Sequence, residues 1–264
     1  GWGLIQKELK KHKTEFIPVD SEHFSIWSVI KDYKKSDIEK VILTASGGPF
    51  LNKKIKKNVS TKDAINHPNW KMGKKISIDS ATMMNKIFEL IEASKIFSIN
   101  INKLDIIIHP KSYVHALVNF KSGYTQLLAH DTKMEIPIFN SIFTRNKIDY
   151  PKKNSINFDI LSNSKFIKPN FKQFPYLTIL KNLKIDDSYF EIILVTINDE
   201  LVDLYLNKKI KFITMQKTLL KLIKKQSFTK YYKKYPKNIS DIFNMVDRVK
   251  KYIKENENKI ISHN

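Results

Sequence analysis

The spacing of hydrophobic and polar residues changes several times along the chain, and each change marks a predicted element. Apolar residues recurring every three or four positions predict helices over 4–13, 24–34 and 81–97, and shorter helices beginning near 63 and 137. Short apolar runs bounded by turn residues predict strands over 16–19, 41–44, 104–110, 113–120 and 124–129, and one just before Ser80. This mixture predicts an α/β domain with a mixed sheet over residues 1–149.

The second half of the chain has a different pattern. Between 150 and 174 the periodicity weakens and Pro, Asn, Ser and Lys accumulate, which predicts a linker. Beyond it every periodic segment is helical, with predicted helices over 176–183, 190–207, 214–226 and 239–257. We therefore expect a small C-terminal helical bundle domain over 175–264, and an α+β fold class for the whole chain.

Composition excludes several classes of protein. Hydrophobic residues make up 42% and aromatic residues 11% of the 264 positions, which is typical of a globular chain and not of a disordered one. No apolar run approaches the roughly 18–20 residues that a membrane helix needs, so we expect no membrane partner. Cysteine is absent, so disulfides are excluded.

The net charge of +21 is also found among nucleic-acid-binding proteins. Nearly all of the positive charge is lysine, since arginine occurs only at Arg145 and Arg248. Nucleic-acid surfaces rely on arginine for bidentate and stacking contacts. We interpret the charge as lysine spread over solvated faces and expect no nucleic-acid partner. A basic nucleic-acid-binding module stays as one alternative function.

Two carboxylates follow the first predicted strand. Asp20 and Glu22 are two positions apart, so in an extended segment both side chains point the same way. Converging carboxylates repel each other unless a cation lies between them, which makes a hard metal such as Mg²⁺ or Mn²⁺ a candidate ligand. The alternative is structural: Asp20 or Ser21 caps the helix over 24–34, with Glu22 in its first turn.

The stretch 67–89, HPNWKMGKKISIDSATMMNKIFE, carries the densest candidate chemistry. Ser80 is a natural N-cap for the helix over 81–97, and a helix N-terminus suits a phosphate. Asn85 and Lys86 would add a donor and a positive charge. Glu89 lies four and three residues beyond them, so all three share one edge of the helix. This pattern indicates an anionic substrate held beside a cation.

Other candidate residues carry weaker signals. The turn at Ser46, which continues into two glycines, could bring backbone amides close to a phosphate, although any tight loop needs glycines. His67 precedes a proline, and is either a substrate contact or a turn residue. Trp70 and Met72 lie in a loop, where they either join the core or close as a lid over a ligand. His109 and His115 could form a metal pair, but lack nearby ligands at suitable spacing and are interpreted as structural.

Taken together, these stretches resemble the 1-deoxy-D-xylulose 5-phosphate reductoisomerase family. The matching motifs are PVDSEH at 18–23, SGGPF at 46–50, HPNWKMGKKISIDSATMMNK at 67–86 with ELIEA at 89–93, and IHPKSYVHA at 108–116. They occur in the family's order over about a hundred residues, and the similarity continues more faintly to the end. One departure is Ile87-Phe88, where the family usually has Gly-Leu.

The resemblance implies roles for individual residues. Asp20, Glu22 and Glu89 would be the ligands of a divalent metal, Mn²⁺ or Mg²⁺. Lys86, Glu22 and Glu89 would be the catalytic groups, and Ser21 and Lys86 would contact the substrate's oxygens together with the two glutamates. Ser46, His67, Ser80 and Asn85 would form a phosphate pocket. Trp70 and Met72 would form a flap over the substrate, and Gly73 would contact NADPH.

The implied activity is the NADPH-dependent conversion of 1-deoxy-D-xylulose 5-phosphate to 2-C-methyl-D-erythritol 4-phosphate in non-mevalonate isoprenoid biosynthesis. The family has a dinucleotide-binding domain before the PVDSEH motif, so we expect this chain to be the catalytic and C-terminal portion of a longer enzyme and to be inactive alone. The resemblance further implies a homodimer in the bacterial cytoplasm, with the plastid as an alternative. Besides a nucleic-acid-binding module, the remaining alternative is a metal-dependent sugar-phosphate isomerase or aldolase that uses no nicotinamide.

Overall fold

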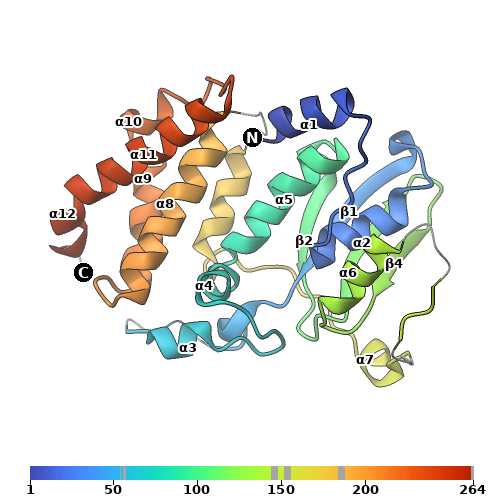
Figure 1. The fold of residues 1–264 in the computed structure, drawn as a ribbon. Coiled ribbons are helices and arrows are strands. Elements are labelled where there is room, and N and C mark those ends of the chain that lie inside the picture. Colours follow the sequence, from blue (N-terminus) through green and yellow to red (C-terminus); the bar gives the residue numbers. More distant parts are fainter. Residues whose placement is uncertain (54, 56–57, 144–147, 152–155, 184–187, 263–264) are drawn as a thin grey trace.

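The computed structural model describes the chain except residues 54, 56–57, 144–147, 152–155, 184–187 and 263–264 (Figure 1). Its sheet has the strand order β2-β1-β3-β4, in which β1 and β2 are parallel and the other pairs are antiparallel. The strands are β1 (Ile38–Ala45), β2 (Leu104–Ile108), β3 (Val114–Phe120) and β4 (Thr125–Ala129). The predicted mixed sheet is confirmed, and so is the α/β architecture followed by a helical region.

Helices make up most of the remaining structure. In the first part of the chain they are α1 (Trp2–Lys11), α2 (Ser21–Ile30), α3 (Thr61–Ile65), α4 (Lys74–Thr82), α5 (Met84–Phe97), α6 (Glu135–Ile142) and α7 (Phe158–Ser162). In the second part they are α8 (Tyr189–Leu206), α9 (Phe212–Leu222), α10 (Gln226–Thr229), α11 (Ile239–Glu255) and α12 (Glu257–Ser262). Short 3-10 turns are η1 (Lys35–Asp37), η2 (Gly48–Phe50), η3 (Ile101–Lys103) and η4 (Pro175–Asn182).

The two faces of the sheet differ in burial. Val41, Leu43 and Ala45 of β1 and their neighbours on β2 and β3 are buried, and α2 and α5 pack on the sheet and on each other. The alternate positions face the other way. There Ile42 pairs with Leu117 and Leu117 pairs with Leu127, and this apolar row is only partly covered.

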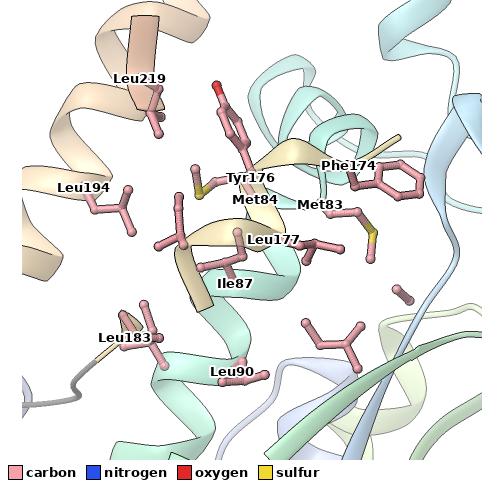
Figure 2. Packing of buried hydrophobic residues seen from close by; sticks show 14 of the residues in the cluster. Met83, Met84, Ile87, Leu90, Phe174, Tyr176, Leu177, Leu183, Leu194 and Leu219 are labelled. Atoms are coloured by element: carbon pink, nitrogen blue, oxygen red, sulfur yellow. The ribbon is translucent and has the colours of Figure 1, made fainter. Parts of the chain in front are cut away.

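One hydrophobic core joins the first part of the chain to the C-terminal helices. Figure 2 shows Met83, Met84 and Ile87 packed among the η4 residues Tyr176 and Leu177. Leu194 of α8 and Leu219 of α9 close the cluster from the other side. The predicted division at 150–174 stays a prediction, and residues 152–155 of that linker lie outside the described residues. None of the helices described is both long and apolar enough to span a bilayer.

Two predicted strands are wrong. Residues 16–19 form no strand, and Phe16 instead packs its ring against Trp2, with centroids 4.9 Å apart. The strand before Ser80 is replaced by α4, which begins after Gly73 and ends at Thr82. The next residue, Met83, has a φ of 65° and breaks the helix. Ser80 is therefore not an N-cap: it lies in the last turns of α4, and the long helix α5 begins at Met84.

Candidate functional site

A cavity of about 260 Å³ opens where β1 ends and α2, α4 and α5 meet. It gathers every site residue predicted from the sequence except Gly73, although these residues come from five separate segments of the chain. The predicted residues on its wall are Asp20, Ser21, Glu22, Ser46, His67, Trp70, Met72, Ser80, Asn85, Lys86 and Glu89.

Three carboxylates converge on one side of this cavity. Asp20, Glu22 and Glu89 each offer an oxygen, and these oxygens lie within 4.8 Å of one another. The capping interpretation of Asp20 is confirmed, because its Oδ1 accepts from the backbone amides of Glu22 (3.2 Å) and His23 (3.3 Å) as the N-cap of α2. The metal interpretation stays a prediction. The carboxylates converge because α2 and α5 pack side by side, and not because the segment is extended.

Lys86 lies within the carboxylate cluster. Its Nζ donates to Glu22 Oε1 at 2.7 Å and to Glu89 Oε2, while Asn85 donates to the other oxygen of Glu89. The predicted shared edge of Asn85, Lys86 and Glu89 is confirmed. Ser21 Oγ donates to Glu22 Oε2 at 2.5 Å, so both oxygens of Glu22 accept a hydrogen bond as well.

Burial and the mutual proximity of Glu22, Lys86 and Glu89 shift the pKa values of all three side chains. Burial alone would raise the pKa of Glu22, but the Lys86 ammonium outweighs it and lowers that pKa to about 2. Burial and the Glu22 carboxylate together raise the pKa of Glu89 well above its usual value. Burial opposes the charge of Lys86 as well, but the two glutamates raise the pKa of that ammonium. Three carboxylates against one ammonium would leave two negative charges when all are ionised, which matches a divalent cation.

Ser46 and His67 form a neutral, hydrogen-bonded pair on another wall. His67 Nδ1 accepts from the backbone amides of Asn69 (3.2 Å) and Trp70 (2.9 Å), so its proton is on Nε2 and is donated to Ser46 Oγ at 2.8 Å. Burial lowers the pKa of His67 to about 4. Ser46 Oγ also accepts from Gly48 N at 3.0 Å, which leaves the hydroxyl proton of Ser46 for a ligand.

The break between α4 and α5 determines how Ser80 and Asn85 face the cavity. Ser80 approaches it from the end of α4, and Asn85 from the first turn of α5. Thr82 supports the break, since its Oγ1 donates to the Ile78 carbonyl at 3.0 Å and accepts from Met84 N at 3.3 Å. The helix N-terminus beside the cavity thus belongs to α5, which begins three residues later than the sequence predicted.

The loop before α4 carries the candidate flap residues. Trp70 and Met72 both line the cavity and neither belongs to the buried core. The Trp70 ring meets His115 edge to face, with centroids 6.2 Å apart. Gly73 lies outside the cavity wall, and a side chain there would meet nothing within 4 Å.

The two histidines of the sequence prediction have structural contacts. His115 is buried, donates to the His130 carbonyl at 3.1 Å and stacks on the His130 ring at 3.8 Å. His109 donates to the Lys165 carbonyl at 3.1 Å and stacks on Phe166. Within the described residues, neither belongs to a group of three or more metal-binding side chains.

Some site residues have no counterpart in the sequence prediction. His23 is buried, and its Nε2 donates to the Glu89 carbonyl at 2.8 Å, which ties α2 to α5. Ser112 lines the cavity and accepts from Asn69 Nδ2 at 2.9 Å. The sequence does hold a feature that could have indicated each of them. His23 directly follows Glu22 of the acidic pair, and Ser112 comes just after a buried strand. The cavity wall also includes Thr44, Ala45, Gly47, Lys71, Ile76, Met83 and Met134.

Comparisons with known proteins give one consistent result. Residues 16–97 match the 1-deoxy-D-xylulose 5-phosphate reductoisomerase C-terminal domain, and residues 131–252 match the DXP reductoisomerase C-terminal domain. The 1-deoxy-D-xylulose 5-phosphate reductoisomerase of Pelagibacter ubique (strain HTCC1062) is 54% identical over 251 residues, which cover 94% of this chain and 64% of the relative. That of Francisella tularensis subsp. novicida (strain U112) is 37% identical over 262 residues, with 95% and 65% covered.

Solved structures agree with these relatives. A crystal structure of DOX-P reductoisomerase in complex with NADPH, fosmidomycin and magnesium has a TM-score of 0.87 at 31% identity, covering 99% of this chain and 67% of that one. The Zymomonas mobilis 1-deoxy-D-xylulose 5-phosphate reductoisomerase in complex with NADPH has a TM-score of 0.83 at 30% identity, covering 94% and 63%. The chain thus spans just under two thirds of the length of the two curated relatives.

Proposed function

This chain belongs to the 1-deoxy-D-xylulose 5-phosphate reductoisomerase family, and on that premise we propose that it carries the metal- and substrate-binding part of such an enzyme. The proposed reaction converts 1-deoxy-D-xylulose 5-phosphate to 2-C-methyl-D-erythritol 4-phosphate in non-mevalonate isoprenoid biosynthesis. The observation that carries this proposal is the convergence of three carboxylates and a set of anion donors on one cavity.

We assign the divalent cation to Asp20, Glu22 and Glu89. Their oxygens lie within 4.8 Å of one another, and carboxylate oxygens are the ligands that Mg²⁺ and Mn²⁺ prefer. A bound ion would supply a Lewis acid and a template for the substrate's carbonyl and hydroxyl oxygens. The neighbouring ammonium of Lys86 would then be freed from part of its pairing with Glu22 and Glu89.

We assign the substrate phosphate to Ser46, His67, Ser80 and Asn85. The unused hydroxyl proton of Ser46 and the start of α5 are suitable donors for a phosphate. His67 stays neutral and orients Ser46 through its Nε2 proton. Holding the phosphate here uses a remote part of the substrate to orient its reacting carbons toward the carboxylates.

We propose that Lys86 and Ser21 contact the oxygens at the reacting end of the substrate. Lys86 lines this cavity from α5. Its ammonium would stabilise oxyanion charge as the carbon skeleton rearranges. Ser21 keeps its hydroxyl beside the same cluster through its bond to Glu22. The rearrangement yields an aldehyde, which hydride transfer then reduces.

We propose NADPH as the hydride donor, with Gly73 as a backbone contact. The open space around Gly73 would let a cofactor approach the chain closely. Trp70 and Met72 would close over the bound substrate and exclude water. We expect this chain to bind the sugar phosphate and the metal.

We further propose that the protein is a homodimer of the bacterial cytoplasm. The partly covered face of the sheet supports this, because a second copy could cover the row formed by Ile42, Leu117 and Leu127. Leu127 is 50% exposed although it is at the centre of β4. The relatives compared above include proteins of the bacteria Pelagibacter and Francisella.

Calorimetric titration with 1-deoxy-D-xylulose 5-phosphate tests the proposed function. We expect the chain to bind the sugar phosphate in Mg²⁺, to lose binding in chelator, and to show competition by inorganic phosphate. Equal binding in Mg²⁺ and in chelator, or no binding in either, would reject the proposal. Tight binding of a random oligonucleotide with no sugar-phosphate binding would favour the nucleic-acid alternative.

A further inference from the structure

Helix α4 needs support from outside itself. It has nine residues, its N-cap Gly73 makes no side-chain capping bond, and Met83 ends it in a left-handed conformation. A helix of this length is marginal on its own in water. Its position, and with it the position of Ser80, must therefore come from tertiary contacts.

Helix α4 makes a buried polar contact with helix α8. Asp79, next to Ser80 in the chain, is 1% exposed, and its Oδ1 accepts from Asn198 Nδ2 at 2.8 Å. Its Oδ2 pairs with Lys75 Nζ at 2.7 Å, and the same ammonium lies 2.9 Å from Asp199 Oδ1. Asn198 is also 1% exposed, so this link between positions 119 residues apart is shielded from water.

A buried carboxylate is stable only when its oxygens are paired. Both oxygens of Asp79 are paired here, one from its own helix and one from α8. Removing the Asn198 amide would leave one oxygen of Asp79 without its partner, and α4 would shift or rotate to bring that oxygen toward another donor or solvent.

On its other side α4 touches the loop that holds Ser46. A Cβ added to Gly48 would lie 2.9 Å from the Ser80 carbonyl oxygen, so the two backbones are in direct contact. A shift of α4 would therefore change the distance between Ser80 and Ser46. The carboxylates Asp20, Glu22 and Glu89 lie on other elements, α2 with its cap and α5, and would move less.

We propose that Asp79 and Asn198 are positioning residues, through which α8 fixes Ser80 opposite Ser46 and so determines phosphate affinity. This proposal rests on the proposed function, because it assumes that Ser80 and Ser46 bind the substrate phosphate. It gives the C-terminal helices a role in substrate binding, although in the described residues none of them lines the cavity.

The test compares two ligands on the whole chain, inorganic phosphate and Mn²⁺, each titrated calorimetrically. We expect Asn198→Ala to weaken phosphate binding by about tenfold, the effect of losing one charge-assisted hydrogen bond, with Mn²⁺ affinity unchanged. The double variant Asp79→Asn with Asn198→Asp keeps a hydrogen bond between the two helices and should recover part of the phosphate affinity. Asn198→Leu keeps the side-chain volume but has no N–H to donate to Asp79, and replaces Asn198→Ala in the test if that variant does not fold.

Lys95→Gln is the matched control. Lys95 Nζ pairs with Glu191 Oε1 at 3.0 Å, so this contact also joins α8 to the first part of the chain, but it does not border the cavity. We expect Lys95→Gln to lower the melting temperature and to leave phosphate affinity intact. Wild-type phosphate affinity in Asn198→Ala, or a parallel loss of phosphate and Mn²⁺ binding, would overturn the positioning role. Failure of the wild-type chain itself to bind phosphate would instead remove the proposed function, and this inference with it.

Discussion

The Lys86 ammonium lies 2.7 Å from a carboxylate oxygen of Glu22, although 64 residues separate the two in the chain. Both side chains are largely buried, at 6% and 15% exposure. This pair joins α2 to α5 at the base of the cavity and partly neutralises the carboxylate cluster. A divalent cation bound to these carboxylates would therefore have to compete with Lys86.

Replacing Lys86 with Met should affect stability and metal affinity in opposite directions. Without the ammonium, three carboxylates face one another, so we expect the metal-free variant to lose about 3 kcal/mol of unfolding free energy. Mn²⁺ should bind more tightly than to wild type, because it no longer competes with a built-in cation. Urea denaturation with and without Mn²⁺ measures both effects, and a Lys86→Met variant that binds Mn²⁺ more weakly would contradict this account.

The raised pKa of Glu89 predicts a pH dependence with a defined sign. Because the pKa of Glu89 is higher in the folded chain, its contribution to stability is complete below its unfolded pKa and is lost as pH rises through its folded pKa. Mn²⁺ would bind the ionised form, so metal affinity should rise as the pH rises through the folded-state pKa of Glu89, with release of protons. Calorimetry in buffers of different ionisation enthalpy counts those protons. No proton release, or an affinity that falls with pH, would be inconsistent with Glu89 as a ligand.

Closure of the proposed flap should change the fluorescence of Trp70. The chain has three tryptophans, and Trp70 is the one that lines the cavity. Adding 1-deoxy-D-xylulose 5-phosphate with Mg²⁺ should shift the emission of wild type and of Trp27→Phe, but not of Trp70→Phe. Trp27 is a suitable control because it packs against Phe24 on α2, away from the cavity wall. A shift that persists in Trp70→Phe would show that the flap does not report substrate binding.

A single substitution that introduces a charge tests the proposed dimer face. Leu127→Lys places an ammonium in the middle of the exposed row on β4, where burial against a second copy would be unfavourable. Sedimentation equilibrium should give a dimer for wild type and a monomer for the variant. Ile239→Lys changes a residue that is 64% exposed on α11, and should remain dimeric. If both variants stay dimeric, the contact is elsewhere.

The shared edge of Asn85, Lys86 and Glu89 was predictable because spacings of three and four residues are a local property of a helix. Convergence of Asp20 on Glu89 was not, since it depends on how α2 packs against α5. Only the family resemblance predicted Glu89 as the third metal ligand. Asp20 and Glu22 still lie together, because Asp20 caps α2 and Glu22 is in the first turn of that helix.

The segment before Ser80 shows where sequence patterns fail. Ile76 and Ile78 alternate with polar residues, which is the pattern of a strand, yet Ile78 is fully buried and Ile76 is 38% exposed on a helix. The contact that supports this helix, Asp79 with Asn198, spans 119 residues and leaves no local signal. Tertiary contacts of this kind override a short alternating pattern.

The most direct test of the central proposal is Mn²⁺ binding to the purified chain, followed by the paramagnetic signal of the free ion. We predict one tight site in wild type and in Asp105→Asn, a control that removes an exposed carboxylate paired with Lys40. The same site should be lost or greatly weakened in Asp20→Asn and in Glu89→Gln. Equal Mn²⁺ binding by all four proteins would contradict a cation held by Asp20, Glu22 and Glu89, and with it the proposed enzyme site.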